Sequence, residues 1–173
     1  SMKDNPKIID IGTGSGCIGI TLAKEIPSSN VIAVDCSEKA LAVAEKNAKN
    51  IGVKNIDFVK SDFLKQSIDF SVDLLVSNPP YIPKKDISTL MTDVREYEPI
   101  EALTDNLDGL EFYRVLSKKF DRMIKIDGAL IVEVGKDEHP LEVKKIIEQS
   151  GHLNIEMIND YNGDIRVLKV TKC

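Results

Sequence analysis

The segment Asn78-Pro79-Pro80-Tyr81 combines residue types that could orient a polar ligand. The side chain of Asn78 and the backbone carbonyl of Pro79 are hydrogen-bond acceptors, the prolines fix the backbone direction, and Tyr81 adds an aromatic surface. Acceptors in a rigid frame could hold N–H groups and stabilise positive charge that forms there. The simpler interpretation is that these residues only end the apolar run 73–77. The other motifs of the chain decide between the two.

A glycine-rich segment, residues 12–16, reads Gly-Thr-Gly-Ser-Gly and lies between an apolar run and a helical pattern. Glycines let a backbone turn sharply and approach a ligand, and the next helix offers unpaired N–H groups. Residues 14–19 also match the dinucleotide fingerprint G-x-G-x-x-G. The apolar run ends at Ile11, however, so a pyrophosphate loop that starts at Gly14 would come about two residues late. Asp10 also suits a cationic ligand better than a pyrophosphate.

Acidic residues end the next two apolar runs as well. Asp35 ends the run 31–35, where a carboxylate can accept hydrogen bonds from both ribose hydroxyls of a nucleoside cofactor. The alternative is that Asp35 only caps the helix that starts near Ser37. Asp62 and Phe63 end the third run, where an acid can accept from an adenine amino group and an aromatic ring can cover the base. The series therefore predicts a nucleoside site at the ends of the strands.

The elements that must position these residues alternate between strand-like and helical patterns. This alternation predicts an α/β domain with a mainly parallel sheet. The strand-like runs are 7–11, 31–35, 56–60, 73–77, 129–134, 154–159 and 164–170, and the helical segments are about 17–25, 38–50, 108–125 and 137–149.

Two connections carry additional information. Asn162-Gly163 suits a tight turn between antiparallel strands, so the final strand should enter the sheet antiparallel. The segment of roughly 78–107 has no clear periodicity and is too long for a simple connection. Such segments in compact domains are usually functional.

Composition bounds the class of protein. The 173 residues, 42% hydrophobic and 29% charged, predict one globular domain over residues 1–173. No apolar run approaches the roughly 20 residues that span a bilayer, and the N-terminus lacks the apolar segment of a signal peptide, so we expect a cytoplasmic protein. The net charge of −5 weighs against tight nucleic-acid binding. Three widely spaced cysteines, Cys17, Cys36 and Cys173, indicate neither disulfides nor a metal site.

Taken in order, these motifs resemble those of the class I S-adenosylmethionine-dependent methyltransferases. The resemblance implies a seven-stranded, Rossmann-like sheet of order 3-2-1-4-5-7-6 with strand seven antiparallel. It implies S-adenosyl-L-methionine as cofactor and S-adenosyl-L-homocysteine as product. The cofactor-binding residues would be Asp10, Gly12, Thr13, Gly14, Ser15, Gly16, Asp35, Cys36, Asp62, Phe63 and Asn78.

Two further stretches narrow the resemblance. YEPIEAL at 97–103 and LDGLEFYR at 107–114, together with NPPYI, are similar to the HemK/PrmC family. That family methylates the glutamine N5 amide in the Gly-Gly-Gln motif of class-1 peptide-chain release factors. The resemblance therefore implies that release factors are the partners of this protein, which we expect to be a monomer. Residues 104–106 read Thr-Asp-Asn where the family usually has a glycine-containing link. The family's N-terminal helical domain, expected to dock the substrate, is absent from this chain.

The resemblance implies that Asn78, Pro79, Pro80 and Tyr81 are the catalytic residues. An amide nitrogen is a poor nucleophile because its lone pair is delocalised. The Asn78 side-chain oxygen and the Pro79 carbonyl could accept its two N–H groups and aim the nitrogen, while Tyr81 packs on the amide plane. No strong base is needed on this account.

Other assignments stay open at this point. An N-methyltransferase acting on a base amine of DNA or ribosomal RNA shares the Asn-Pro-Pro-Tyr segment, a ribosomal-protein glutamine is another possible target, and a nicotinamide-binding domain fits the glycines less well. Glu98 could contact a ligand or be an exposed carboxylate. We expect no catalytic role for His139 at a helix start or for His152, and Lys84 and Lys85 should be solvated.

Overall fold

The computed structural model describes residues 4–66, 70–97, 99–151 and 153–172. Its seven strands form one sheet of order β3-β2-β1-β4-β5-β7-β6, which confirms the predicted order. Neighbouring strands are parallel from β3 to β5, and β7 is antiparallel to both β5 and β6, as predicted. The strands are β1 Lys7–Ile11, β2 Asn30–Asp35, β3 Ile56–Lys60, β4 Val72–Ser77, β5 Ile124–Glu133, β6 Leu153–Asn159 and β7 Ile165–Lys172.

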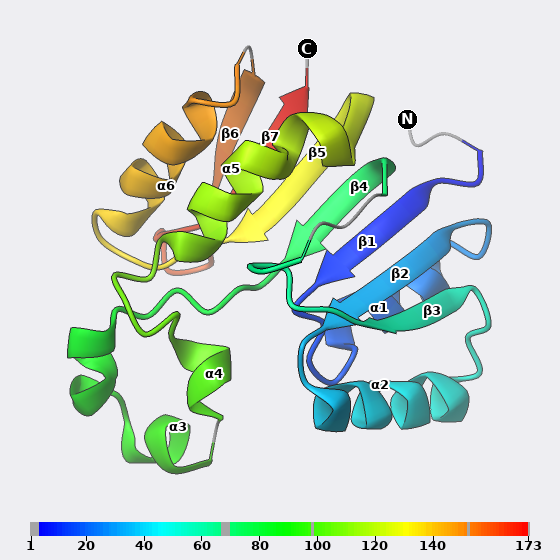
Figure 1. Cartoon of the computed structure of the whole chain (residues 1–173), viewed down its shortest axis with the longest axis horizontal. Coiled ribbons are helices and arrows are strands. Elements are labelled where there is room, and N and C mark those ends of the chain that lie inside the picture. The colour runs from blue at the N-terminus through cyan, green and yellow to red at the C-terminus, as the bar shows by residue number, and fades with distance from the viewer. Residues whose placement is uncertain (1–3, 67–69, 98, 152, 173) are drawn as a thin grey trace.

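Helices cover both faces of this sheet (Figure 1). The larger core cluster contains side chains of α5 and α6, such as Tyr113, Phe120 and Ile147, packed against the sheet. A smaller cluster lies between α1 and the sheet and includes Ile8 and Ala23. The longer helices are α1 Cys17–Glu25, α2 Glu38–Ile51, α5 Glu111–Met123 and α6 His139–Glu148.

The long segment after β4 is not structureless. It holds the 3₁₀ helix η1 Lys84–Thr89 and the short helices α3 Thr92–Tyr97 and α4 Ile100–Leu103. We call residues 84–103 the short-helix lobe. Figure 1 shows the lobe, in green, beyond the carboxyl ends of β4 and β5, apart from the layers of the sheet. The segment thus forms a separate projection beside the loops that follow the parallel strands.

The predicted boundary between the helix 108–125 and the strand 129–134 was wrong. Residues 124 and 125 belong to β5, which starts five residues before the predicted bound of 129. The β4–β5 ladder shifts register between Val72 and Leu74, and Asp127 takes a positive φ of 63°. This irregularity lets the strand continue across Asp127-Gly128, which in the sequence reads as a break. The start of the predicted helix, residues 108–110, is a loop, and the other bounds agree to within two residues.

The helices of the described residues include none with the length and apolar content that crossing a bilayer requires. Within the same residues, no group of three or more His, Cys, Asp or Glu side chains is placed to hold a metal ion.

The loop between the last two strands forms a hydrogen-bonded turn. Asp160 Oδ1 accepts the N–H groups of Asn162 and Asp164, at 2.8 and 3.1 Å, and Gly163 has a φ of 91°. A positive φ is the conformation that Gly adopts without strain. The predicted turn at Asn162-Gly163 is therefore confirmed.

Candidate active site

The glycine segment forms a tight loop between β1 and α1. Gly12, Gly14 and Gly16 have φ values of 73°, 57° and 86°, which other residues rarely adopt. The N–H groups of Gly12 and Thr13 donate to the carbonyl of Val34, at 2.8 and 3.0 Å. These bonds fasten the loop to the end of β2, so the carboxyl ends of β1 and β2 lie side by side.

Asp10 supports the loop from below. Its side chain is only 1% exposed, and Oδ2 accepts the Thr13 hydroxyl at 2.6 Å and the Gly19 N–H at 2.8 Å. Burial raises the pKa of the carboxyl, while these two hydrogen bonds oppose the shift. Its other oxygen has no partner among the described residues. Its role in cofactor binding stays a prediction, and in this geometry Asp10 would act by shaping the loop.

Asp35 lies at the end of β2 beside the loop. Oδ2 accepts the N–H of Gly14 and Oδ1 accepts that of Ser37, both at 2.8 Å. The N-cap of α2 is Ser37, whose hydroxyl oxygen accepts the N–H of Ala40 at 3.3 Å. The alternative that Asp35 only caps α2 is therefore wrong, because Ser37 is the N-cap. Each oxygen of Asp35 retains a further acceptor site.

The residues predicted after β2 and β3 take different environments. Cys36 is exposed, and the pKa of its thiol is raised by partial burial and by the nearby carboxylates of Asp35 and Asp62. Asp62 pairs with Lys65 at 2.8 Å, a contact that lowers the pKa of the carboxyl. Ser15 is exposed at the outer side of the glycine loop. Asp35 and Asp62 thus place two carboxylates near Cys36 at the carboxyl ends of β2 and β3.

Phe63 is placed differently from the expectation. Its ring is 5% exposed, packs 5.0 Å from the Phe112 ring, and has the Lys119 ammonium 4.4 Å from its centroid. The side chain therefore belongs to the core beneath α5, and its surface is already covered. The structure does not bring this ring to an exposed site beside Asp62.

Asn78 lies where β4 and the glycine loop meet. A Cβ added to Gly12 would lie 3.9 Å from the Asn78 carbonyl oxygen, and the Ser77 hydroxyl ties the strands together by donating to Ile11 at 2.6 Å. The Asn78 side chain is exposed and has no hydrogen-bond partner among the described residues. Pro79 is buried behind it. The structure thus brings the Asn-Pro-Pro segment next to the glycine loop.

Tyr81 is anchored in the protein. Its hydroxyl donates to Glu133 Oε1 at 3.0 Å and accepts from Arg166 at 2.8 Å, and Arg166 also pairs with Glu133 at 2.8 Å. Burial and the Glu133 carboxylate raise the pKa of the Tyr81 hydroxyl. The side chain is therefore tied to β5 and β7, and its predicted packing on a substrate would involve only the ring surface that this network leaves open.

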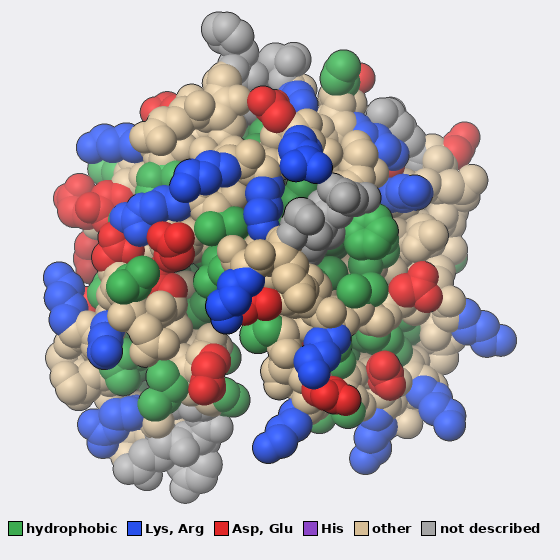
Figure 2. All heavy atoms as spheres, in the orientation of Figure 1, with side chains coloured by type: hydrophobic (Ala, Val, Ile, Leu, Met, Phe, Trp, Pro, Cys, Tyr) green, Lys and Arg blue, Asp and Glu red, His purple; other side chains and the backbone are tan. Residues whose placement is uncertain are grey.

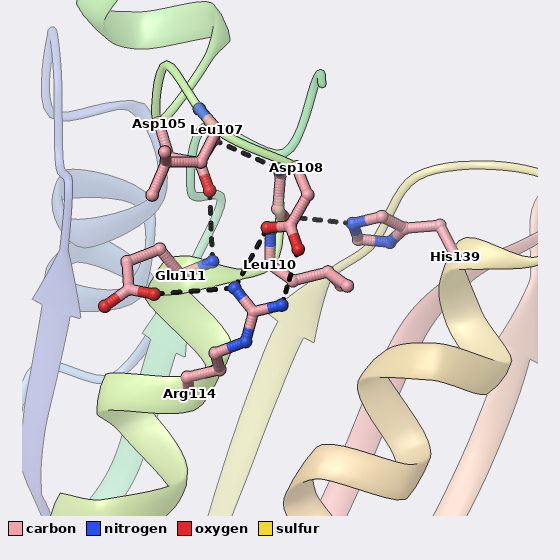
Figure 3. Close-up of polar contacts among 8 residues, drawn as sticks. Asp105, Leu107, Asp108, Leu110, Glu111, Arg114 and His139 are labelled. Carbon is pink, nitrogen blue, oxygen red and sulfur yellow. Dashed lines mark hydrogen bonds and ion pairs between the residues drawn. The ribbon is translucent and has the colours of Figure 1, made fainter. Parts of the chain in front are cut away.

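A second group of residues, to which the sequence analysis gave no structural role in the site, holds the loop before α5 (Figure 3). Asp105 accepts the N–H groups of Leu107, Gly109 and Glu111 at 2.8 to 3.0 Å. His139 contacts the carbonyl of Gly109 at 3.2 Å. Asp followed at short range by Asp-Gly is a turn signal that could have indicated this loop. No local signal marks His139, because its partners come from distant parts of the chain.

The segment after Tyr81 runs along this loop. The Ile82 N–H donates to Leu103 at 2.9 Å and the Lys84 N–H to Leu107 at 3.0 Å. Lys84 and Lys85 are exposed, as predicted, whereas Glu98 and His152 lie outside the described residues. Figure 2 shows the surface notched between the short-helix lobe and α2, and the carboxyl ends of β1 and β4 point toward that side.

Comparison with known proteins places the chain among methyltransferases. The model of the methyltransferase small domain family matches residues 1–96. A release factor glutamine methyltransferase of Fusobacterium nucleatum subsp. nucleatum is 41% identical over 170 residues, covering 98% of this chain and 48% of the relative. One of Bacillus subtilis is 37% identical, covering 94% of this chain and 57% of the relative. The chain therefore spans about half the length of the curated relatives that it matches.

A solved structure supports the fold independently. A ribosomal-protein methylase of Lactobacillus delbrueckii subsp. bulgaricus superposes with a TM-score of 0.71 at 21% identity, covering 100% of this chain and 73% of that one. Such a low identity supports the fold alone, which is that of class I S-adenosylmethionine-dependent methyltransferases. Because the family model matches more than half of the chain, residues 1–96, the chain belongs to the methyltransferase small domain family.

Proposed function

We propose that this chain is the catalytic part of an enzyme that transfers a methyl group from S-adenosylmethionine to the glutamine N5 amide in the Gly-Gly-Gln motif of class-1 release factors. The observation that carries the proposal is Asn78, whose backbone carbonyl lies against Gly12 and whose exposed side chain has no hydrogen-bond partner in the described residues. The names of the relatives support the substrate class. We assign docking of the release factor to the residues that those relatives have beyond the part that this chain matches.

The residues around the glycine loop fit such a cofactor. When bound, S-adenosylmethionine supplies an electrophilic methyl group on a positively charged sulfur. Asp35 retains acceptor sites for ribose hydroxyls, because each of its oxygens uses only one site for a backbone N–H. Asp62 and Asp35 together provide negative charge near the carboxyl ends of the strands, which favours a cationic ligand over a pyrophosphate.

Asn78 and Pro79 would prepare the amide for transfer. The Asn78 side-chain oxygen and the Pro79 carbonyl accept the two N–H groups of the substrate amide and hold its nitrogen toward the methyl group. As the new N–C bond forms, positive charge grows on nitrogen, and both acceptors become more favourable. The nitrogen then loses one proton to solvent, so no buried base is required. In-line positioning of this kind can supply roughly 7–11 kcal/mol of the barrier reduction.

The test is a transfer assay with labelled S-adenosylmethionine. The chain is incubated with a release factor, with the same factor in which the Gly-Gly-Gln glutamine is replaced by glutamate, and with ribosomal RNA and DNA. The expected result is label on the first protein only, because glutamate has no amide nitrogen. Label on nucleic acid, or equal label on the two release factors, would contradict the proposal. A longer relative serves as the positive control.

A further inference from the structure

His139 stands at the start of α6 and reaches two separate parts of the backbone. Figure 3 shows its contact with the loop before α5. The Gly135 N–H donates to Nδ1 at 3.0 Å, and Nε2 lies 3.2 Å from the carbonyl oxygen of Gly109. Because a backbone N–H can only donate, Nδ1 must be unprotonated. The ring hydrogen is therefore on Nε2, which donates to Gly109. His139 is a neutral ring that joins the end of β5 to the loop before α5.

Gly109 in turn contacts the Asn-Pro-Pro-Tyr segment directly. It has a φ of 80°, and a Cβ added there would lie 2.2 Å from the Tyr81 carbonyl oxygen and 3.3 Å from the Pro83 nitrogen. No side chain fits between the two backbones, so the position of Gly109 sets the position of the Tyr81 carbonyl. Because Pro79 and Pro80 have little torsional freedom, a shift at Tyr81 is passed on to the acceptors at Asn78 and Pro79.

We propose that His139 is a positioning residue of the methyl-transfer site: its Nε2–H holds Gly109, and Gly109 holds the backbone of Asn78-Pro79-Pro80-Tyr81 in the geometry that receives the substrate nitrogen. The inference rests on the proposed function for its catalytic consequence. The structural coupling itself rests on the hydrogen bonds and the backbone contact alone.

The surroundings of the ring keep it neutral. The rings of Tyr81 and Tyr113 lie 5.9 and 5.4 Å from the His139 ring, from the loop after β4 and from α5. Burial lowers the pKa of His139, and the hydrogen bond to Gly109 opposes the shift. The charged groups that act on it are Glu142 of its own helix, Arg166 of β7 and Asp105 of the loop before α5.

Protonation of His139 would break this arrangement. It would place a second N–H on Nδ1 that faces the Gly135 N–H. The two donors repel each other, which displaces the ring and weakens its bond to Gly109 as well, whereas a glutamine places no donor against Gly135. Since the pKa in the folded protein lies below the ordinary value of 6.5, the neutral form is complete above that value and is lost as the pH falls through the lowered pKa. Turnover should therefore fall as the pH falls through the lowered pKa of His139.

Three substitutions test the contacts of the two ring nitrogens separately. In His139→Gln the amide nitrogen takes the place of Nε2 and can donate to Gly109. In His139→Asn the amide oxygen takes the place of Nδ1 and can accept from Gly135, but nothing reaches Gly109. His139→Phe keeps a ring against Tyr81 and Tyr113 and removes both hydrogen bonds.

The measurements are kcat, its pH profile and cofactor affinity by calorimetry. We expect His139→Asn and His139→Phe to lower kcat by about 10- to 100-fold, the scale of a displaced site, with cofactor affinity unchanged. His139→Gln should retain most of kcat and lose the fall on the acidic side. Equal losses in His139→Asn and His139→Gln, or normal turnover in His139→Phe, would overturn the proposal.

Amide hydrogen exchange provides a readout that does not depend on the proposed reaction. The N–H groups of Ile82 and Lys84 bond to Leu103 and Leu107, and should exchange faster in His139→Asn and His139→Phe but not in His139→Gln. If the wild-type chain transfers no methyl group even at saturating cofactor and high release-factor concentration, the proposed function fails and this comparison alone decides the coupling. Equal exchange rates in all four proteins would overturn it.

Discussion

The carboxylate of Asp35 accepts a hydrogen bond from the backbone N–H of Gly14 at 2.8 Å, although 21 residues separate the two in the sequence. The bond joins the end of β2 to the loop after β1, and Ser37 fixes the other carboxylate oxygen. A carboxylate has about four acceptor sites. Two are used by these backbone groups, and the others are available to ligand hydroxyls in a position that the fold has already fixed.

Replacement of Asp35 should therefore weaken cofactor binding. We expect Asp35→Ala to weaken the binding of S-adenosylmethionine by about 1.5–3 kcal/mol, the range for hydrogen bonds to a charged group. Isothermal titration calorimetry measures the change. Asp57, an exposed acid near the start of β3, gives the matched control for lost negative charge, and Asp57→Ala should bind the cofactor normally. Unchanged affinity in Asp35→Ala would remove the ribose role of this residue.

Replacement of Asn78 should affect turnover more than cofactor affinity. Its acceptor matters most when charge develops on the substrate nitrogen, so Asn78→Ala should lower kcat by about 10²- to 10³-fold. Steady-state transfer assays at saturating cofactor measure this, with calorimetry for cofactor affinity. Asn154→Ala, an exposed asparagine on β6, is the control. If Asn78→Ala turned over at a normal rate, the mechanism proposed for the Asn-Pro-Pro segment would be wrong.

The strands could be predicted from local patterns, and their order from the family resemblance. Apolar runs bounded by turn residues placed β1 to β4, and Asn162-Gly163 indicated the antiparallel β7. The start of β5 could not be placed this way. Ile124 and Lys125 continue the preceding helical pattern, and only pairing with β4 makes them part of a strand. Tertiary contacts decided where local propensity was ambiguous.

The sequence indicated where the candidate site residues lie along the chain, and it did not indicate the directions of their side chains. Phe63 and Tyr81 stand at the predicted strand ends, but Phe63 packs on Phe112 and Tyr81 bonds to Glu133. Which way an aromatic side chain turns depends on elements far along the chain, here α5 and β5. The same reason explains why His139, whose partners are Gly109 and Gly135, was expected only to start a helix.

The buried Asp10 predicts a pH-dependent difference in stability. Burial raises its pKa above 3.8, so the folded state binds this proton more tightly than the unfolded state. Its contribution to stability therefore falls as the pH rises from 3.8 through the raised pKa, and is constant above it. Asp10→Asn lacks this titration, so the free energy of unfolding of Asp10→Asn relative to wild type should increase over that window.

Urea unfolding at several values from about pH 4 to about pH 7 measures this relative free energy. Other carboxylates, such as Asp62 and Asp108, have lowered pKa values and are common to both proteins, so their effects cancel in the difference. A difference that does not change with pH, or that falls as the pH rises, would show that burial does not disfavour the Asp10 carboxylate.

Gly109 and Gly52 form a matched pair for the backbone contact with Tyr81. Both have a positive φ, of 80° and 84°, so alanine at either position takes a strained conformation that costs about 1–2 kcal/mol. A Cβ at Gly52 meets nothing within 4 Å, whereas a Cβ at Gly109 would lie 2.2 Å from the Tyr81 carbonyl oxygen. Gly109→Ala should therefore lose more stability than Gly52→Ala, because backbone atoms must move apart as well.

Urea midpoints with unchanged m-values give the two losses, and transfer assays give their functional effect. Gly52→Ala, at the end of α2, should keep normal turnover, because its site is remote from Asn78. Gly109→Ala should lower kcat per folded molecule. The displacement of the Tyr81 carbonyl shifts the preceding backbone, and with it the Pro79 carbonyl that accepts from the substrate amide. Equal losses of stability and equal turnover in the two variants would mean that the loop before α5 moves away freely, and that the Asn-Pro-Pro segment holds its geometry without Gly109.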